Sequence, residues 1–168
     1  RNDWYGRRAR VILQQRAAEG RLSPVVPTLL WELFAQSQTA AQKLRALWAL
    51  HVTKQLPVDR LLPLLDHAEP TIRSWAIQLL GEDRAVGPEA LKKFAAMAPA
   101  DPSPVVRLAL ASVLQRIPLA DRWTIAQGLL THAGDSADHN IPKLIWSGIE
   151  PLVPTDTPRA LALAAGAS

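Results

Sequence analysis

Apolar residues recur at helical spacing in short segments along the chain, and turns that contain proline separate these segments. In one segment they stand at Ile72, Trp75, Ala76, Leu79 and Leu80, the i, i+3, i+4, i+7, i+8 stripe of an amphipathic helix. The fourteen prolines fall between such segments or in their first turns, where a helix tolerates proline. No segment keeps the strict alternation of a β-strand. The pattern predicts an all-α protein.

Ten helices follow from these boundaries. They span residues 3–16, 25–36, 39–54, 58–66, 70–81, 88–97, 103–116, 119–131, 140–152 and 157–165. The composition agrees, because the chain holds 27 alanines and 26 leucines, the strongest apolar helix formers. With 168 residues, 48% of them hydrophobic, the chain is also long and apolar enough to bury a core.

The second helix of each predicted pair begins with a basic residue in an equivalent place. These residues are Arg7, Lys43, Arg73, Arg107 and Lys143, at successive spacings of 36, 30, 34 and 36 positions. A nearly constant period of this length is the signature of a helical repeat protein. We expect these side chains to form a ladder with acidic partners, Asp66 and Asp101 among them. Arg73 and Arg107 are then held by polar groups instead of projecting into solvent.

One motif identifies the kind of repeat. Asp101-Pro102-Ser103-Pro104-Val105-Val106-Arg107 and the looser copy at 66–73 resemble the HEAT repeat, whose inner helix opens with Asp-Pro-x-Pro-x-Val-Arg. The physics suits a helix start, because a short polar residue caps free N–H groups and proline occupies the first turn. The resemblance implies a right-handed α-solenoid (an α-α superhelix) of about five HEAT-like repeats.

We expect residues 1–168 to form a single HEAT-like repeat domain that belongs to a longer chain. The predicted helices begin with the second helix of one pair and end with the first helix of another. A free-standing solenoid instead ends in terminal repeats with a polar outer face.

Several phrases carry a more specific resemblance. They are residues 2–10, 44–51, 70–82 and, most distinctively, Asp-His-Asn-Ile-Pro-Lys-Leu-Ile-Trp at 138–146 followed by Gly-Ile-Glu-Pro-Leu at 148–152. Together they resemble the helical region of planctomycete-type membrane-bound dehydrogenase proteins. In that family a sugar-dehydrogenase-like β-propeller precedes the helical repeats, and a c-type cytochrome domain with a Cys-x-x-Cys-His motif follows them. The resemblance implies an extracytoplasmic location and a role beside those domains.

The loop from His132 to His139 concentrates the metal-ligand types of the chain. His132, Asp135, Asp138 and His139 stand within eight residues, and such groups bind zinc and other divalent ions. Their spacing matches no standard zinc motif, however, and small polar residues with glycine also make ordinary helix–helix loops. We favour the loop interpretation, in which residues 138–140 cap the next helix, and we expect no metal or other cofactor in this segment.

The six tryptophans have two interpretations: they line a binding groove, or they pack in the hydrophobic core. Trp48, Trp75 and Trp146 fall on the inward side of aligned helices, where large rings are usually core. Trp4, Trp31 and Trp123 stand nearer to helix starts or outer helices, so we expect them to be partly exposed.

Trp146 also belongs to a candidate interface with Glu150. Lys143, Trp146 and Glu150 share roughly one side of a helix, because they stand three and seven positions apart. The Glu150 carboxylate accepts hydrogen bonds from the next helix or a docked domain, or else it stands at a helix end in solvent.

The charge balance is mildly basic, with 19 lysines and arginines against 15 acidic residues. Arg7, Arg8, Arg10 and Arg16 crowd the first helix, and a row of such residues along a concave face binds a phosphate backbone in DNA-repair glycosylases of HEAT-like fold. Because acidic neighbours neutralise much of the row, nucleic acid is the less favoured partner.

No residue of this segment carries a catalytic motif. The chain has no cysteine and no G-x-S-x-G elbow, P-loop, G-x-G-x-x-G or His-Glu-x-x-His motif, and its apolar stretches are too short to span a membrane. We therefore expect a non-catalytic scaffold that binds neighbouring domains of the same chain or another protein. The alternative is a nucleic-acid-binding protein similar to the glycosylases.

Overall fold

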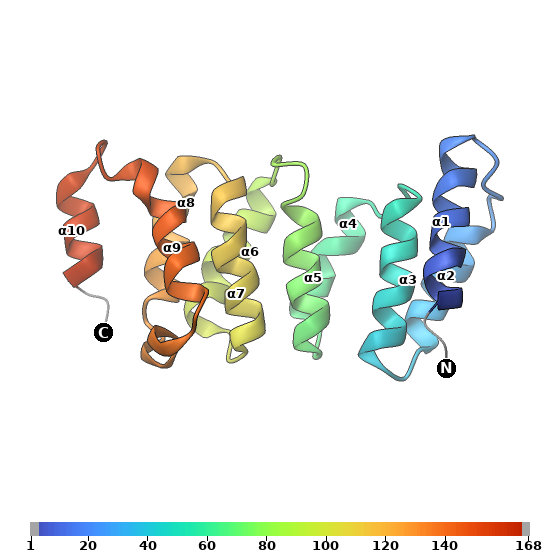
Figure 1. The fold of residues 1–168 in the computed structure, drawn as a ribbon, viewed down its shortest axis with the longest axis horizontal. Helices are drawn as coiled ribbons and strands as arrows, with labels where there is room; N and C mark the ends of the chain where they lie inside the picture. Colours follow the sequence, from blue (N-terminus) through green and yellow to red (C-terminus); the bar gives the residue numbers. More distant parts are fainter. Residues whose placement is uncertain (1–3, 166–168) are drawn as a thin grey trace. The chain divides into compact units, whose positions relative to one another are not determined.

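The computed structural model describes residues 4–165, and within that range every regular element is a helix and no strand occurs (Figure 1). The α-helices are α1 (Trp4–Ala18), α2 (Val26–Gln36), α3 (Ala40–Val52), α4 (Val58–Leu61), α5 (Pro70–Leu80), α6 (Pro88–Ala100), α7 (Pro104–Val113), α8 (Leu119–Leu129), α9 (Ile141–Ile149) and α10 (Thr157–Ala165). Four 3₁₀ segments accompany them: η1 (Leu62–Asp66), η2 (Leu114–Arg116), η3 (Ala133–Ala137) and η4 (Glu150–Leu152). The all-α prediction is confirmed.

The helix boundaries differ from the predicted ones mainly near prolines. The predicted helix 58–66 is divided into α4 and η1, because Pro63 cannot donate the backbone hydrogen bond that an α-helix needs there. Helix α6 ends three residues later than predicted and contains Pro99 in its last turn. The Pro99 ring packs against Gly128 of α8, where a Cβ atom would lie 2.7 Å from the proline Cδ. The absence of a side chain at Gly128 leaves room for that ring.

Helices α1 and α3 end in the same pair of backbone hydrogen bonds. After α1, Gly20 N–H donates to Ala17 O and Arg21 N–H to Arg16 O. After α3, Lys54 N–H donates to His51 O and Gln55 N–H to Leu50 O. This is the Schellman pattern, which requires a left-handed residue at its centre. Glycine occupies that place at Gly20, with φ of 67°, but lysine occupies it at Lys54, with φ of 59°.

Backbone contacts divide the chain into two compact units, one up to Leu61 and one from Leu62 onward. In the first unit α3 packs against α2 and against α1. Its core is built from Phe34 of α2 and from Leu44, Leu47 and Leu50 of α3, all of them buried. Helix α1 contributes no fully buried side chain.

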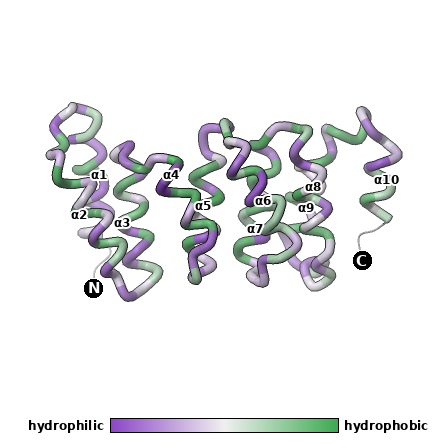
Figure 2. The backbone as a smooth tube through the Cα atoms, turned by 180° about the vertical axis from the view of Figure 1, so that it is seen from behind, coloured by the Kyte–Doolittle hydropathy of each residue, from purple (hydrophilic) through white to green (hydrophobic). Residues whose placement is uncertain are grey.

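The helices of the second unit pack in two rows. Helix α7 lies between α5 and α9 in one row, and α6 packs against α8 in the other. Each helix has both hydrophobic and hydrophilic positions, as the colours of Figure 2 show. The apolar positions meet between the rows, where Ile72, Phe94, Leu110 and Ile125 are almost completely buried. A smaller cluster of Trp123, Leu152 and Ala160 attaches α10.

None of the helices in residues 4–165 combines the length and the apolar character that crossing a membrane requires.

Candidate functional site

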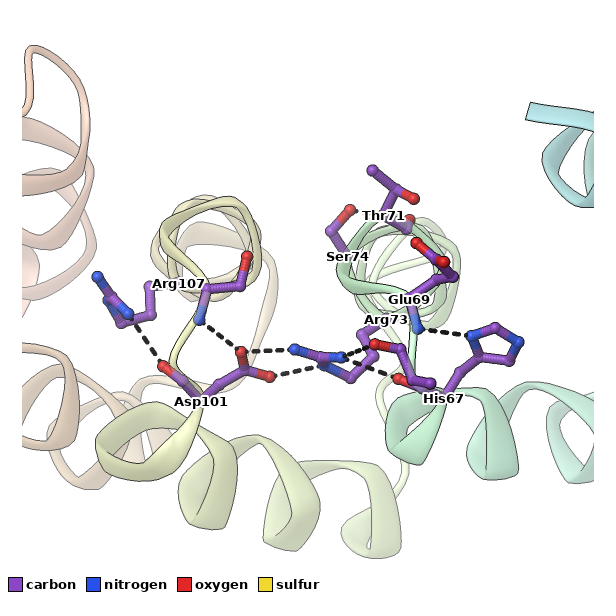
Figure 3. Close-up of polar contacts among 9 residues, drawn as sticks. His67, Glu69, Thr71, Arg73, Ser74, Asp101 and Arg107 are labelled. Carbon is purple, nitrogen blue, oxygen red and sulfur yellow. Dashed lines mark hydrogen bonds and ion pairs between the residues drawn. The ribbon is translucent and has the colours of Figure 1, made fainter. Parts of the chain in front are cut away.

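A buried ion pair joins the first turn of α5 to the loop before α7. Arg73 Nε and Nη2 each lie 2.8 Å from one oxygen of the Asp101 carboxylate, a bidentate contact. Arg73 Nη1 also donates to the backbone carbonyls of His67 and Ala68, at 2.9 and 3.0 Å (Figure 3). The hydrogen bonds to Asp101 raise the pKa of Arg73 above its ordinary value, although desolvation acts against them. Asp101 is held in turn by the Ser103 N–H, at 2.9 Å.

The next helix of the row repeats this arrangement. Arg107 Nε and Nη2 lie 2.5 and 2.6 Å from the two oxygens of Asp135, and Nη1 donates to the Asp101 carbonyl at 3.0 Å. Hydrogen bonding to Asp135 likewise raises the pKa of Arg107. Arg107 thereby connects Asp101 to Asp135, and we call Arg73, Asp101, Arg107 and Asp135 the arginine–aspartate chain.

The two halves of the arginine–aspartate chain have the same sequence geometry. Each arginine pairs with the aspartate 28 residues later and donates to the carbonyl 6 residues earlier. Equivalent positions are therefore 34 residues apart. The prediction that Arg73 and Arg107 are held by polar groups is confirmed, and their buried charges are compensated by bidentate partners.

The other basic and acidic residues predicted for the ladder have different surroundings. Lys43 donates to the Phe34 carbonyl at 3.1 Å and lies over the Phe34 ring. Asp66 pairs with Lys93 at the surface. Lys143 is exposed, with Nζ 3.4 Å from His139 Nε2. Arg7 is exposed on α1.

The four candidate metal ligands of the 132–139 loop each contact different partners. His132 Nε2 lies 2.9 Å from the Ala98 carbonyl, Asp135 pairs with Arg107, and His139 neighbours Lys143. Asp138 accepts hydrogen bonds from the Asn140 and Ile141 N–H groups, at 2.8 and 2.9 Å, as expected for a cap of α9. Nowhere in the part of the chain that the structure describes do three or more such side chains come together to hold a metal ion.

Those hydrogen bonds also affect the acidity of Asp138. The Ile141 N–H, followed by the Asn140 N–H, holds the pKa of Asp138 below its ordinary value of 3.8, because both donors stabilise the charged carboxylate.

A mostly apolar pocket of about 220 Å³ lies beside this loop, between α8, η3 and α9. Leu129, Leu130, Ile141, Pro142 and Ile145 form most of its wall, and His132, Asp135 and Ser136 complete the lining. The polar groups of the lining are engaged within the protein: His132 at Ala98, Asp135 at Arg107, and the Ser136 hydroxyl at the Ala133 carbonyl.

Two tryptophan predictions are wrong. Trp123 is 6% exposed, although its place on an outer helix predicted partial exposure. Its ring is covered by Leu152 and Ala160 of the C-terminal segment, and Arg159 lies over it at 5.0 Å. Trp146, predicted as core, is 53% exposed. Ile141, Ile145 and Ile149 occupy the buried side of α9, so Trp146 faces solvent.

The remaining tryptophans are closer to the predictions. Trp48 and Trp75 are half-buried, and Arg10 lies over the Trp48 ring at 5.1 Å. Trp4 is 59% exposed. Trp31 is half-buried, with Arg60 over its ring at 5.5 Å.

The exposed side of α9 carries a large aromatic ring, because Trp146 is 53% exposed. Lys143, Trp146 and Ser147 are exposed there, and Glu150 is exposed at the start of η4. A large aromatic ring flanked by a cation and an anion is typical of the centre of a protein–protein contact. We call Lys143, Trp146, Ser147 and Glu150 the α9 face.

Comparison of the chain with family models, curated proteins and solved structures finds no match in any of the three.

Proposed function

We propose that this chain is a HEAT-like repeat segment, a right-handed α-solenoid of about five repeats that acts as a non-catalytic scaffold. The observation that carries the proposal is the arginine–aspartate chain, in which one set of contacts recurs after 34 residues. A repeat protein makes identical contacts between successive units because each unit buries its faces only against its neighbours.

The packing of the second unit supports this proposal. Alternate helices lie in the same row, so that α7 contacts α5 before it and α9 after it. Stacked helix pairs produce this order, and a closed four-helix bundle does not.

The α9 face is the docking surface that we propose. Burial of the half-exposed Trp146 ring by a partner removes a large apolar area from water, while Lys143 and Glu150 at its sides select the partner by charge.

The partners that we propose are a β-propeller and a c-type cytochrome domain. They are the neighbours of the helical region in the dehydrogenase family that the sequence resembles, where the repeats would hold the two domains in place outside the cytoplasm. The chemistry then belongs to the neighbouring domains, because the polar groups of the arginine–aspartate chain are used by the fold itself.

A binding titration with a propeller domain and a cytochrome domain of that family tests the proposal. We expect Trp146→Ala to weaken binding by roughly tenfold or more, as at other central aromatic contacts, and Glu150→Ala to weaken it less. Both variants should retain the wild-type thermal midpoint, since both side chains are exposed.

The matched control is Leu119→Ala, which removes an exposed apolar side chain from α8. If both domains bind the Trp146→Ala and Leu119→Ala variants equally, the α9 face is not their docking surface. If neither domain binds the wild-type chain, the proposed partners are wrong.

Nucleic acid is the second candidate partner, because the basic residues gather in the first unit. Residues 4–61 contain nine lysines and arginines against three acidic residues, whereas residues 62–165 contain nine against eleven. A concentration of positive charge of this kind attracts phosphate groups.

A further inference from the structure

Helix α1 has one covered side and one open side. Its covered side packs against α3, where Leu13 and Ala17 are half-buried and Arg10 lies over the Trp48 ring. On the opposite side Trp4 is 59%, Val11 51% and Ile12 38% exposed. With Arg8 these residues stand at i, i+4, i+7 and i+8, so they form a continuous stripe along the helix. We call Trp4, Arg8, Val11 and Ile12 the α1 stripe.

The charge of α1 is of one sign. The helix contains four arginines and neither aspartate nor glutamate. Arg8 lies within the α1 stripe, and Arg7 and Arg16 are exposed on the same helix. Because Arg8 and Arg16 are exposed cations on a helix without acidic side chains, the helix attracts a partner that brings carboxylates or other anions.

The apolar members of the α1 stripe restrict the kind of anion. A nucleic acid would use the arginines through its phosphates and the Trp4 ring by stacking, but it would leave Val11 and Ile12 in water. A helix with its own apolar stripe covers these side chains as well, and its flanking glutamates or aspartates reach the arginines. Such a helix also fits the length of α1, about 22 Å for fifteen residues.

We propose that the α1 stripe docks an acidic amphipathic helix of a partner protein. The contact is of the helix-on-helix type, in which apolar side chains at i, i+3, i+4 and i+7 supply the anchors and ion pairs at the edges select the partner. The proposal rests on the function proposed above, a protein-interaction module, and adds a second surface with its own partner chemistry.

A fluorescein-labelled peptide of about 18 residues provides the probe, with leucines at i, i+3, i+4 and i+7 and glutamates at the flanking positions. We expect saturable binding to the full chain by fluorescence anisotropy at physiological salt. We expect no binding of the same peptide with lysines in place of glutamates, or of a scrambled peptide of the same composition.

Matched variants locate the contact. Arg8→Glu should weaken peptide binding about fivefold or more, the effect of losing one exposed ion pair and adding a like-charge contact. Its control, Arg116→Glu, makes the same charge change at an exposed site of η2 and should have little effect. Val11→Ser should weaken binding, whereas Val105→Ser at a similarly exposed valine of α7 should not. Arg8→Gln, which keeps a good helix former, should give an intermediate loss.

Three outcomes overturn the proposal. The first is equal binding by the Arg8→Glu and Arg116→Glu variants. The second is a combined result: Val11→Ser leaves the affinity for the peptide unchanged, and a single-stranded oligonucleotide of equal charge binds as tightly as the peptide. The α1 stripe would then be a general polyanion site. The third is no binding of the acidic peptide by the wild-type chain. Trp146→Ala should not change the affinity for the peptide. A failure of the proposal for the α1 stripe is therefore distinguishable from a failure of the proposal for the α9 face.

Discussion

At the scale of single residues, the fold depends on the charged side chains of the arginine–aspartate chain, which are almost completely buried. The side chains of Arg107 and Asp135 are 9% and 10% exposed, and those of Arg73 and Asp101 are 12% and 6% exposed. A buried ion requires a partner with good geometry, since its hydration is lost on folding. Both pairs meet this requirement through bidentate contacts and backbone carbonyls, so removing one member should cost more than removing both.

We predict that Arg107→Met destabilises the protein by about 3 kcal/mol, because it leaves the Asp135 carboxylate buried without its cation. Asp135→Leu should cost a similar amount through the uncompensated guanidinium. The double variant should lose less than the sum of the two single variants, and a double-mutant cycle by urea unfolding measures that coupling. If the two losses of unfolding free energy are additive, the coupling energy between Arg107 and Asp135 is zero, which would contradict the prediction.

The cap of α9 makes a pH-dependent contribution. The folded chain holds the pKa of Asp138 below 3.8, so its stabilising effect is complete above that pH and is lost as the pH falls through the lowered pKa. We predict that Asp138→Asn, which keeps a capping oxygen, differs most from the wild type above pH 3.8 and that the difference narrows below it. Urea unfolding at pH values on both sides of 3.8 provides the measurement. A difference that is constant with pH would contradict this role of Asp138.

Sequence patterns located many of these residues but assigned some of them the wrong surroundings. The aligned helix starts identify Arg73 and Arg107, whereas Asp135 stands among histidines in the sequence, which makes it a candidate metal ligand instead of an arginine partner. Its spacing contained the missing signal, because Asp101 and Asp135 both follow their arginines by 28 residues. For Trp123 and Trp146 the pattern was insufficient, since burial there depends on which neighbouring segment covers the ring.

At the scale of elements, helix starts and ends are set by local chemistry, and most of them were therefore predictable. Pro70, Pro88 and Pro104 each begin a helix as the sequence predicts. The observed bounds differ from the predicted ones at the 3₁₀ turns and at the C-terminal end of α6, which continues through Pro99. Both features depend on packing against other helices and on backbone hydrogen bonding, which the sequence of one segment does not show.

The two Schellman ends give a prediction at this scale. Lys54 has φ of 59°, a left-handed conformation that costs a residue with a Cβ about 1–2 kcal/mol. We predict that Lys54→Gly stabilises the protein by about 0.5–1 kcal/mol, after allowance for the greater freedom of glycine in the unfolded chain. Thermal unfolding checks the sign.

The reverse change provides the control for Lys54→Gly. A Cβ added at Gly20 meets no atom within 4 Å, so Gly20→Ala tests the backbone conformation alone. It should destabilise the protein by about 1 kcal/mol. A loss of stability in Lys54→Gly would mean that the lysine side chain contributes more than its backbone conformation costs.

At the scale of the whole molecule, the uneven distribution of charge has the largest consequence. The chain has a formal net charge of +4, but the excess lies entirely in the first unit, because residues 62–165 carry more acidic than basic residues. Some cations of the first unit already have partners within the protein. Lys43 donates to the Phe34 carbonyl, and Arg21 forms an ion pair with Glu19. The first unit therefore attracts a polyanion more strongly than the second, and four of its nine cations belong to α1.

We predict that nucleic-acid binding is weak, independent of sequence and limited to this helix. If α1 neutralises about three phosphates, the affinity for a duplex falls roughly 40-fold between 50 and 200 mM salt. An anisotropy titration across that range measures the slope, and Arg8→Glu should reduce both the slope and the affinity, whereas Arg116→Glu should have little effect. Three phosphate contacts without contacts to the base edges give only a weak, salt-sensitive affinity. The dissociation constant at physiological salt should therefore be micromolar or weaker. Submicromolar duplex binding under those conditions would instead require a continuous basic surface beyond α1, and it would favour the glycosylase-like alternative over the scaffold.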